Sequence, residues 1–229
     1  MTDPTASQGT RERILLFVKA PRAGSVKTRL VPVLGPSGAE TLYRAFGLDF
    51  LETLHQAGRP VTACFHPPEE IDAVRKWLGT GLSYAPQEGE DLGRRMDRAF
   101  RAAFDAGEDP VLAVGGDTPD LPATLLEEAF RVLGESDAVI VPATDGGYAS
   151  IGFTRQGYCP EAFSGIDWGS PSVLDQTLAI LAARGTRVGR LDPWPDVDTH
   201  ADLEALRARL VQSGACPAVR ALLGKEETG

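Results

Sequence analysis

The stretch from Ile14 to Leu30 reads ILLFVKAPRAGSVKTRL and joins an apolar run to a basic loop. Its first five residues are continuously apolar, which predicts a strand that is covered on both faces of a sheet. The segment from Lys19 onward holds four basic residues and no acidic one, although the formal net charge of the chain is -9. A polyanionic ligand would explain this loop, and the alternative is a solvated run of charge.

Apolar runs and amphipathic segments alternate along the rest of the chain. Further strands are predicted at residues 61–65, 82–85, 111–114, 138–141, 146–153 and 188–191. Helices are predicted from a capping box at Ser37 and Glu40, at 69–78, from Asp91, at 122–133, from Ser170, and from Thr199. This order predicts an α/β fold with a single doubly wound, mostly parallel sheet and helices on both faces. We expect one domain over 13–213, with a loose N-terminus (1–12) and a C-terminal tail (214–229).

The composition is that of a soluble globular protein, with 42% hydrophobic and 24% charged residues. The 23 basic against 32 acidic residues argue against nucleic acid or an anionic membrane as the partner. The three cysteines fit neither a disulfide framework nor a zinc site, so we expect a cytoplasmic protein. No apolar run reaches the roughly 18 residues of a membrane helix, and we assign no oligomeric state.

Ligands of doubly wound sheets bind beyond the carboxyl ends of the strands. Four polar segments follow predicted strands and are candidates for one shared site: residues 19–30, 115–122, 143–148 and 192–203. In the first, Gly24 lets the backbone bend, and Lys27 and Arg29 would complete a phosphate cradle. The segment is neither a Walker loop nor a dinucleotide fingerprint, so an ordinary exposed basic loop stays open.

Two pairs of aspartates also follow predicted strands. Asp117 comes after an apolar strand and two glycines, where packing gives no reason for a carboxylate, and Asp120 follows it as a cap for the next helix or as a ligand. Asp196 and Asp198 form the second pair. The next residue, Thr199, has capping-box spacing to Asp202. Asp198 could reach a metal held by Asp117, because Mg²⁺ uses one or two carboxylates together with phosphate oxygens.

Six motifs together resemble the nucleotide-diphospho-sugar transferase superfamily, whose fold is the glycosyltransferase-A fold. They are FVKAPRAGSVKTRL, QEGEDLGRRM, GGDTPDL, DGGYASIGF, FSGIDWGSPSVLDQT and DVDTHADL. More narrowly, they resemble a bacterial family that is labelled glycosyltransferase and is related to guanylyltransferases of cofactor biosynthesis. The resemblance covers the chain from Ile14 to about Leu210.

The resemblance implies a role for each matching position. Nucleotide and phosphate binding falls to Lys19, Gly24, Lys27, Arg29, Gln87, Leu92 and Gly93. Asp117 and Asp198 would bind Mg²⁺ or Mn²⁺, and the sugar or acceptor would meet Asp145, Gly146, Gly147, Tyr148 and Trp168. Asp117, Lys27 and Asp145 are the candidate catalytic residues. For Tyr148 and Trp168, packing is the alternative, and no histidine receives a role.

The resemblance leaves the reaction open. The sugar-1-phosphate nucleotidyltransferases of the superfamily carry Gly-x-Gly-Thr-Arg, whereas Gly24 is followed here by Ser-Val-Lys-Thr-Arg, and the spacing from Asp117 to Asp120 is not Asp-x-Asp. The first hypothesis is metal-dependent glycosyl transfer from a nucleotide sugar to a small acceptor, with Asp145 as the base. The alternatives are nucleotidyl transfer from a nucleoside triphosphate to a phosphorylated acceptor, with release of pyrophosphate, and a non-catalytic nucleotide-binding module.

Overall fold

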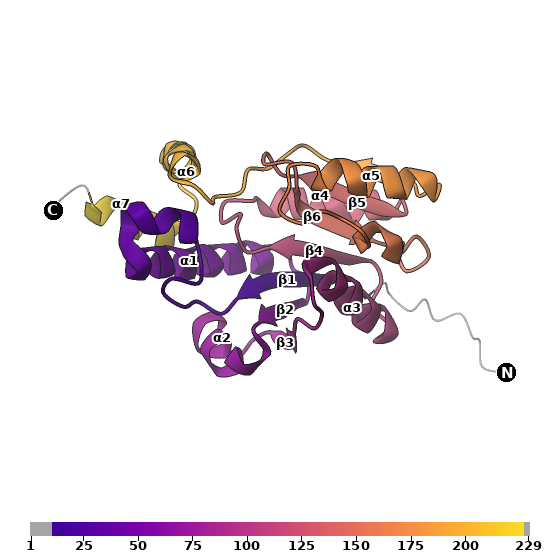
Figure 1. Ribbon diagram of the computed structural model, residues 1–229, viewed down its shortest axis with the longest axis horizontal. Coiled ribbons are helices and arrows are strands. Elements are labelled where there is room, and N and C mark those ends of the chain that lie inside the picture. Colours follow the sequence, from indigo (N-terminus) through magenta and orange to yellow (C-terminus); the bar gives the residue numbers. More distant parts are fainter. Residues whose placement is uncertain (1–10, 227–229) are drawn as a thin grey trace.

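A seven-stranded sheet forms the centre of the computed structural model, which describes residues 11–226 (Figure 1). The strand order is β3-β2-β1-β4-β6-β5-β7. The strands are β1 (Arg13–Lys19), β2 (Val61–His66), β3 (Ser83–Pro86), β4 (Val111–Gly115), β5 (Ala138–Pro142), β6 (Tyr148–Phe153) and β7 (Val188–Arg190). Each overlaps a strand predicted from the sequence.

The sheet is parallel except for one strand. β1 pairs in parallel with β2 and β4, so that Leu16 lies between Ala63 and Val114. Only β6 runs antiparallel, and it does so against both β4 and β5. The predicted α/β class with a mostly parallel sheet is confirmed. Because β6 is reversed, its first residue, Tyr148, lies at the edge where the neighbouring strands end.

Helices cover both faces of the sheet (Figure 1). The helices are α1 (Val31–Gln56), α2 (Ile71–Leu78), α3 (Leu92–Asp105), α4 (Ala123–Leu133), α5 (Val173–Ala183), α6 (His200–Ser213) and α7 (Pro217–Glu226), with short 3-10 turns η1 (Thr28–Leu30), η2 (Pro68–Glu70) and η3 (Pro160–Phe163). Of these, α6 and α7 pack against α1 rather than on the sheet. On one face, α1, α2 and α4 pack on alternate strand residues, and on the other, α3 and α5 pack on the residues between them. This alternation follows from the twofold side-chain period of a strand.

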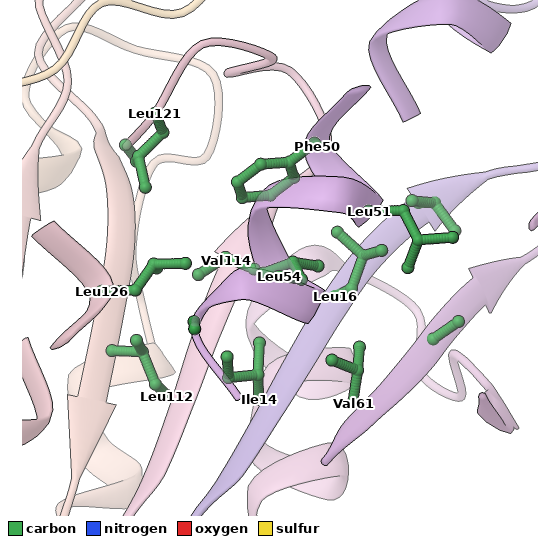
Figure 2. Packing of buried hydrophobic residues seen from close by; sticks show 14 of the residues in the cluster. Ile14, Leu16, Phe50, Leu51, Leu54, Val61, Leu112, Val114, Leu121 and Leu126 are labelled. Atoms are coloured by element: carbon green, nitrogen blue, oxygen red, sulfur yellow. The ribbon is translucent and has the colours of Figure 1, made fainter. Parts of the chain in front are cut away.

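The first of these cores is shown in Figure 2, where Ile14 and Leu16 of β1 lie beneath Phe50 and Leu54 of α1. All four side chains are fully buried. Burial of each such side chain stabilises the fold by roughly 1.5–3 kcal/mol. The apolar run of β1 is buried on both faces, as predicted, because Leu15 enters the opposite core.

Two helix starts differ from the sequence predictions. The helix expected at Ser37 begins at Val31 and is interrupted at Gly35, whose φ of 69° leaves the helical region. Glu40 pairs with Arg44 instead of closing a capping box. The helix expected from Ser170 begins at Val173, after Ser172. In contrast, the capping box of Thr199 and Asp202 is present at the start of α6.

The tail predicted for residues 214–229 is wrong over most of its length, because α7 lies there. Cys216, Val219 and Leu223 are buried against α1 and α6 in a third core. The Asp49 carboxylate of α1 accepts hydrogen bonds from the N–H groups of Ala218 (2.9 Å) and Val219 (2.8 Å). This side chain therefore fixes the start of α7 to the middle of α1.

Of the loose N-terminus expected over 1–12, residues 1–10 lie outside the described residues. The two that follow are held in place. The carbonyl of Arg11 accepts a hydrogen bond from the Asp109 N–H (3.0 Å), and Glu12 pairs with Arg59 at 2.7 Å. Across residues 11–226, none of the helices combines the length and the apolar character that a membrane crossing demands.

Candidate functional site

A cavity of about 660 Å³ opens at the carboxyl edge of the sheet. The loops after β1, β4, β5 and β7 all contribute to it, as expected for this class of fold. Nine residues proposed from the sequence line it: Lys19, Lys27, Arg29, Gln87, Leu92, Asp117, Asp145, Tyr148 and Asp198. Tyr43, Arg95 and Asp196 line it as well.

The segment after β7 crosses the sheet edge and brings Asp198 to Asp117. The N–H groups of Leu191 and Trp194 donate to the carbonyls of Ile140 (3.0 Å) and Pro142 (2.9 Å) at the end of β5. Farther on, the Val197 N–H donates to the Asp117 carbonyl at 3.0 Å. The two aspartates predicted to share a metal are therefore neighbours.

Lys27 lies between these two carboxylates. Its Nζ forms an ion pair with Asp117 and donates a hydrogen bond of 2.8 Å to Oδ1 of Asp198. The Lys27 side chain is 2% exposed, whereas those of Asp117 and Asp198 are 51% and 41% exposed. Burial alone would lower the pKa of Lys27, but the two carboxylates outweigh it and hold the pKa above its ordinary value.

The backbone at Lys27 is in the left-handed region, with φ 47° and ψ 45°. A residue with a side chain rarely adopts this conformation and pays of order 1 kcal/mol or more for it. The turn is closed by a hydrogen bond from the Leu30 N–H to the Lys27 carbonyl (2.9 Å). The conformation directs the side chain inward, where Nζ lies 5.5 Å from the centre of the Phe46 ring.

Three other cations in the cavity have no carboxylate partner among residues 11–226. They are Lys19 at the end of β1, Arg29 in η1, and Arg95 in α3. Arg95 is fixed by a hydrogen bond from Nε to the Gly89 carbonyl at 3.0 Å. Unpaired cations that converge on one cavity favour an anionic ligand.

The two aspartates fit a hard divalent ion that is completed by phosphate oxygens. Within residues 11–226, no group of three or more His, Cys, Asp or Glu side chains is placed to hold an ion by itself. Mg²⁺ needs only one or two carboxylates when a substrate supplies phosphate oxygens. Asp117 and Asp198 meet that requirement in donor chemistry and position.

Two more carboxylates belong to the cavity. Asp145 is exposed in the turn between β5 and β6, where its Oδ1 accepts a hydrogen bond of 2.8 Å from the Gly147 N–H. Asp196 is half-buried, and burial raises its pKa to about 6, with the charges of Asp145 and Asp198 adding to the shift. The acids follow β4, β5 and β7, which lie together on one side of β1 in the strand order, whereas the cations come from the β1 loop and α3. Apart from Lys27, which reaches across to Asp117 and Asp198, the cavity is therefore divided by charge.

Comparison with known proteins identifies the family. The family described as "Uncharacterized protein conserved in bacteria (DUF2064)" matches residues 50–170. A crystal structure from Desulfovibrio desulfuricans G20, provisionally named a nucleotide-diphospho-sugar transferase, is 38% identical with a TM-score of 0.91 over 96% of both chains. The chain belongs to the DUF2064 family. The predicted resemblance to nucleotide-diphospho-sugar transferases is thereby confirmed.

More distant structures share the fold of this DUF2064 protein. CMP:2-keto-3-deoxy-manno-octonic acid synthetase, solved with CTP, is 15% identical with a TM-score of 0.57, over 89% of this chain and 99% of that one. 4-Diphosphocytidyl-2C-methyl-D-erythritol synthase from Anaerococcus prevotii DSM 20548 is 12% identical with a TM-score of 0.58, over 89% and 100%. No curated protein matches the sequence.

Several residues proposed for the site of the DUF2064 protein lie behind or beside the cavity lining. Gly24 is in the exposed part of the first loop, with a φ of 76°. A side chain at Gly93 would collide with the Phe163 carbonyl and the Trp168 indole, so Gly93 lets α3 approach these residues. Trp168 itself packs edge-on against Tyr148, with ring centres 6.4 Å apart.

The glycines of the β5–β6 turn also permit a close approach of the backbone to neighbouring residues. Gly146 has a φ of 94°, and a side chain there would collide with Pro171. The turn is closed by a hydrogen bond of 3.0 Å from the Ala143 N–H to the Gly147 carbonyl. Gly146 and Gly147 therefore shape the loop that carries Asp145.

Gln87 lines the cavity with part of its amide already engaged. Its Nε2 donates to the carbonyls of Val18 (3.0 Å) and Cys64 (2.7 Å). Both partners are acceptors, which fixes the orientation of the amide. Only Oε1 is left to meet a ligand.

Asp120 does not cap helix α4, which was one of the two roles considered for it. Its carboxylate is 5% exposed and pairs with Arg209 of α6 at 2.6 Å, and the Trp194 indole N–H donates to it at 3.3 Å. Helix α4 begins after Pro122 without a side-chain cap. Asp120 therefore ties the site loop to α6.

Proposed function

We propose that this protein is a metal-dependent glycosyltransferase that uses a nucleotide-sugar donor. The observation that carries the proposal is the division of the cavity into a cationic side and an acidic side. A nucleotide sugar has the matching polarity, because its diphosphate is anionic and its sugar is neutral. As part of the same proposal, the three unpaired cysteines favour a cytoplasmic location.

The cationic side would hold the diphosphate. Lys19, Arg29 and Arg95 lack carboxylate partners among the described residues, so their donors, except the Arg95 Nε that is bonded to Gly89, remain for phosphate oxygens. Arginine and lysine contacts of this kind neutralise the charge that grows on a phosphate leaving group. Leu92 and Gln87 line the same side and would face the base.

Asp117 and Asp198 would hold Mg²⁺ or Mn²⁺ between the two sides. Bound there with phosphate oxygens, the ion would act as a Lewis acid that stabilises the departing nucleoside diphosphate. The two aspartates reach it from loops that the Val197–Asp117 hydrogen bond holds together. Lys27 is in contact with both carboxylates and therefore lies next to the phosphates as well.

The acidic side would take the acceptor. Asp145 and Asp196 repel a phosphorylated acceptor and favour a neutral one that reacts through a hydroxyl group. One of the two would accept the hydroxyl proton while the acceptor oxygen bonds to the sugar carbon and the bond from that carbon to phosphate breaks. Asp145 is the exposed candidate, and the pKa of Asp196, raised to about 6, suits Asp196 to the role of base.

Nucleotidyl transfer is the second candidate, and Arg95 favours it. A third unpaired cation gives the cavity enough positive charge for a triphosphate chain as well as for a diphosphate. In that reaction the acceptor would be a phosphorylated small molecule, and pyrophosphate would leave. A non-catalytic nucleotide-binding module would use the same cations without turnover.

Product analysis distinguishes these functions. The protein is incubated with a panel of nucleotide sugars and Mn²⁺, and in parallel with nucleoside triphosphates and phosphorylated acceptors. Release of nucleoside diphosphate from a nucleotide sugar is the expected result. Release of pyrophosphate only would replace the proposal by nucleotidyl transfer, and binding without either product would leave a binding module.

Asparagine variants test the acidic side. Replacement of the base, either Asp145→Asn or Asp196→Asn, should lower turnover by about 10²–10⁴-fold. The matched control is Asp192→Asn, an exposed aspartate of the same crossing segment that does not line the cavity. Equal turnover in all three variants would contradict a carboxylate base.

A further inference from the structure

The position between Asp117 and Asp198 is already taken by a cation of the chain itself. The Lys27 ammonium contacts a carboxylate oxygen of each aspartate. It is the buried partner, at 2% exposure, while both aspartates keep open surface toward the cavity. An ammonium that bridges two carboxylates occupies the place that a divalent ion shared by them would need.

The surroundings hold the ammonium at this place. The backbone of Lys27 is left-handed, its side chain is buried, and its Nζ lies over the Phe46 ring, 5.5 Å from the ring centre. An aromatic face attracts a cation. Lys27 is thus positioned as a fixed counter-ion, unlike Lys19, which lines the same cavity exposed and without a carboxylate partner among the described residues.

A divalent ion and the ammonium compete for the same two carboxylates. Two carboxylates carry two negative charges, so they cannot balance an ammonium and a divalent ion together. A phosphate chain changes this balance, because it brings further negative charge and offers the ammonium new acceptor oxygens. Lys19 and Arg29 in the same cavity mark where such a chain would lie.

We propose that Lys27 is a built-in counter-ion that blocks the divalent-metal position of the free protein, so that metal binds only together with a phosphate chain. The inference rests on the metal site of the proposed function and adds to it an order of binding. Metal alone binds weakly, and nucleotide and metal bind cooperatively. Lys27 exchanges its aspartate partners for phosphate oxygens in that step.

The test is the binding of Mn²⁺ to the full chain in the absence of nucleotide. Binding is measured by the loss of the electron paramagnetic resonance signal of free Mn²⁺. Lys27→Met removes the ammonium and keeps an unbranched apolar side chain over Phe46. We expect it to bind Mn²⁺ at least about tenfold more tightly than the wild-type protein. Lys19→Met is the matched control, because it removes one positive charge from the same cavity without releasing a carboxylate.

Binding by Lys27→Met that is no tighter than binding by Lys19→Met would overturn the proposal. Lys27→Gln serves as a second variant if the methionine variant does not fold by circular dichroism, with the same two outcomes. Melting temperatures give an independent reading. Mn²⁺ alone should raise the melting temperature of the Lys27 variant more than that of the wild-type protein, and an equal rise in both would contradict the exchange.

These outcomes are separate from those of the proposed function. Metal-dependent turnover by the wild-type protein, together with an Mn²⁺ affinity that is unchanged in Lys27→Met, would remove the counter-ion role alone. Tighter Mn²⁺ binding by Lys27→Met, with no product formed by the wild-type protein from any nucleotide sugar or triphosphate, would keep the counter-ion role and remove the proposed reaction.

Discussion

The Val197 N–H donates a hydrogen bond of 3.0 Å to the carbonyl oxygen of Asp117, which joins two loops that are far apart in the sequence. Asp198 follows Val197 directly, so the bond sets the position of its carboxylate relative to that of Asp117. The side chain of Val197 is fully buried. The two acidic loops are therefore held together at the sheet edge, and the two carboxylates lie on neighbouring segments.

Asp117→Asn should abolish metal-dependent nucleotide binding and leave the fold intact. The side chain is half-exposed, and its loss removes one of two carboxylates from the candidate metal site. The measurement is a thermal-shift titration with nucleotide and Mn²⁺. A titration equal to that of the wild-type protein would show that Asp117 is not a ligand.

Asp120→Asn, in the same loop, is the matched control for that variant. It weakens the partly buried pair with Arg209, which should cost roughly 2 kcal/mol of stability. The nucleotide titration should keep its shape because Asp120 does not line the cavity. The two variants thus separate binding from stability within one loop.

Arg29→Ala should weaken the binding of a nucleoside diphosphate much more than that of the free nucleoside. A hydrogen bond to a charged group contributes about 1.5–3 kcal/mol, so a loss of about tenfold or more is expected for the diphosphate. Arg29 is exposed, and the melting temperature should change little. Isothermal titration calorimetry with both ligands measures the difference, and an equal loss for both would mean that Arg29 supports the structure.

As the pH rises from about 4 to 6, the free energy of unfolding of the metal-free wild-type protein should fall relative to that of the Asp196→Asn variant. Burial raises the pKa of Asp196 from 3.8 to about 6, with Asp145 and Asp198 adding to the shift. Between these two pKa values the folded state binds more protons than the unfolded state. The contribution of protonated Asp196 to stability is therefore fully present below the unfolded-state pKa of 3.8, and it is lost as the pH rises through the folded-state pKa of about 6. The group is half-exposed, so solvent screening limits the change to about 1 kcal/mol.

Urea unfolding in the presence of a chelator, at pH 4.5 and pH 7.5, measures this effect. The stability difference between the wild-type protein and Asp196→Asn should depend on pH, whereas that between the wild-type protein and Asp192→Asn should not. A pH-independent difference for Asp196→Asn would show that its carboxyl group has an ordinary pKa.

Truncation after Ser213 should destabilise the protein by about 4 kcal/mol or more. It removes Cys216, Val219 and Leu223 from the third core, and each buried apolar side chain of this size stabilises the fold by roughly 1.5–3 kcal/mol. It also leaves the Asp49 carboxylate without its two N–H donors. Val211→Ala in α6, where the side chain is 85% exposed, should change the free energy of unfolding little. Equal stability of the truncated and full-length chains would show that α7 contributes nothing.

The convergence of the site could be predicted because it follows from sheet geometry. Parallel strands end at one edge, so polar residues that come directly after apolar runs meet there. Lys19, Lys27, Arg29, Asp117 and Asp198 were placed together by this rule, and all five line the cavity. The roles given to them stay predictions.

Other features depend on long-range contacts that no local pattern reports. Arg95 lies in the first turn of α3. The start of this helix at Asp91 could be predicted from the sequence, but which of its side chains face the cavity could not. The partners of Lys27 and Asp120 are set by where distant loops and α6 dock. Helix α7 is short, and its weak apolar pattern was not distinguished from a tail.

Within residues 11–226, four basic and four acidic side chains line the cavity, while the formal net charge of the chain is -9. Local attraction at the basic side therefore operates inside a molecule that repels anions at longer range. Mobile ions screen that repulsion beyond roughly 8 Å at physiological ionic strength. Moderate salt should consequently speed the arrival of a polyphosphate, the reverse of the behaviour of a protein that steers anions with its whole surface.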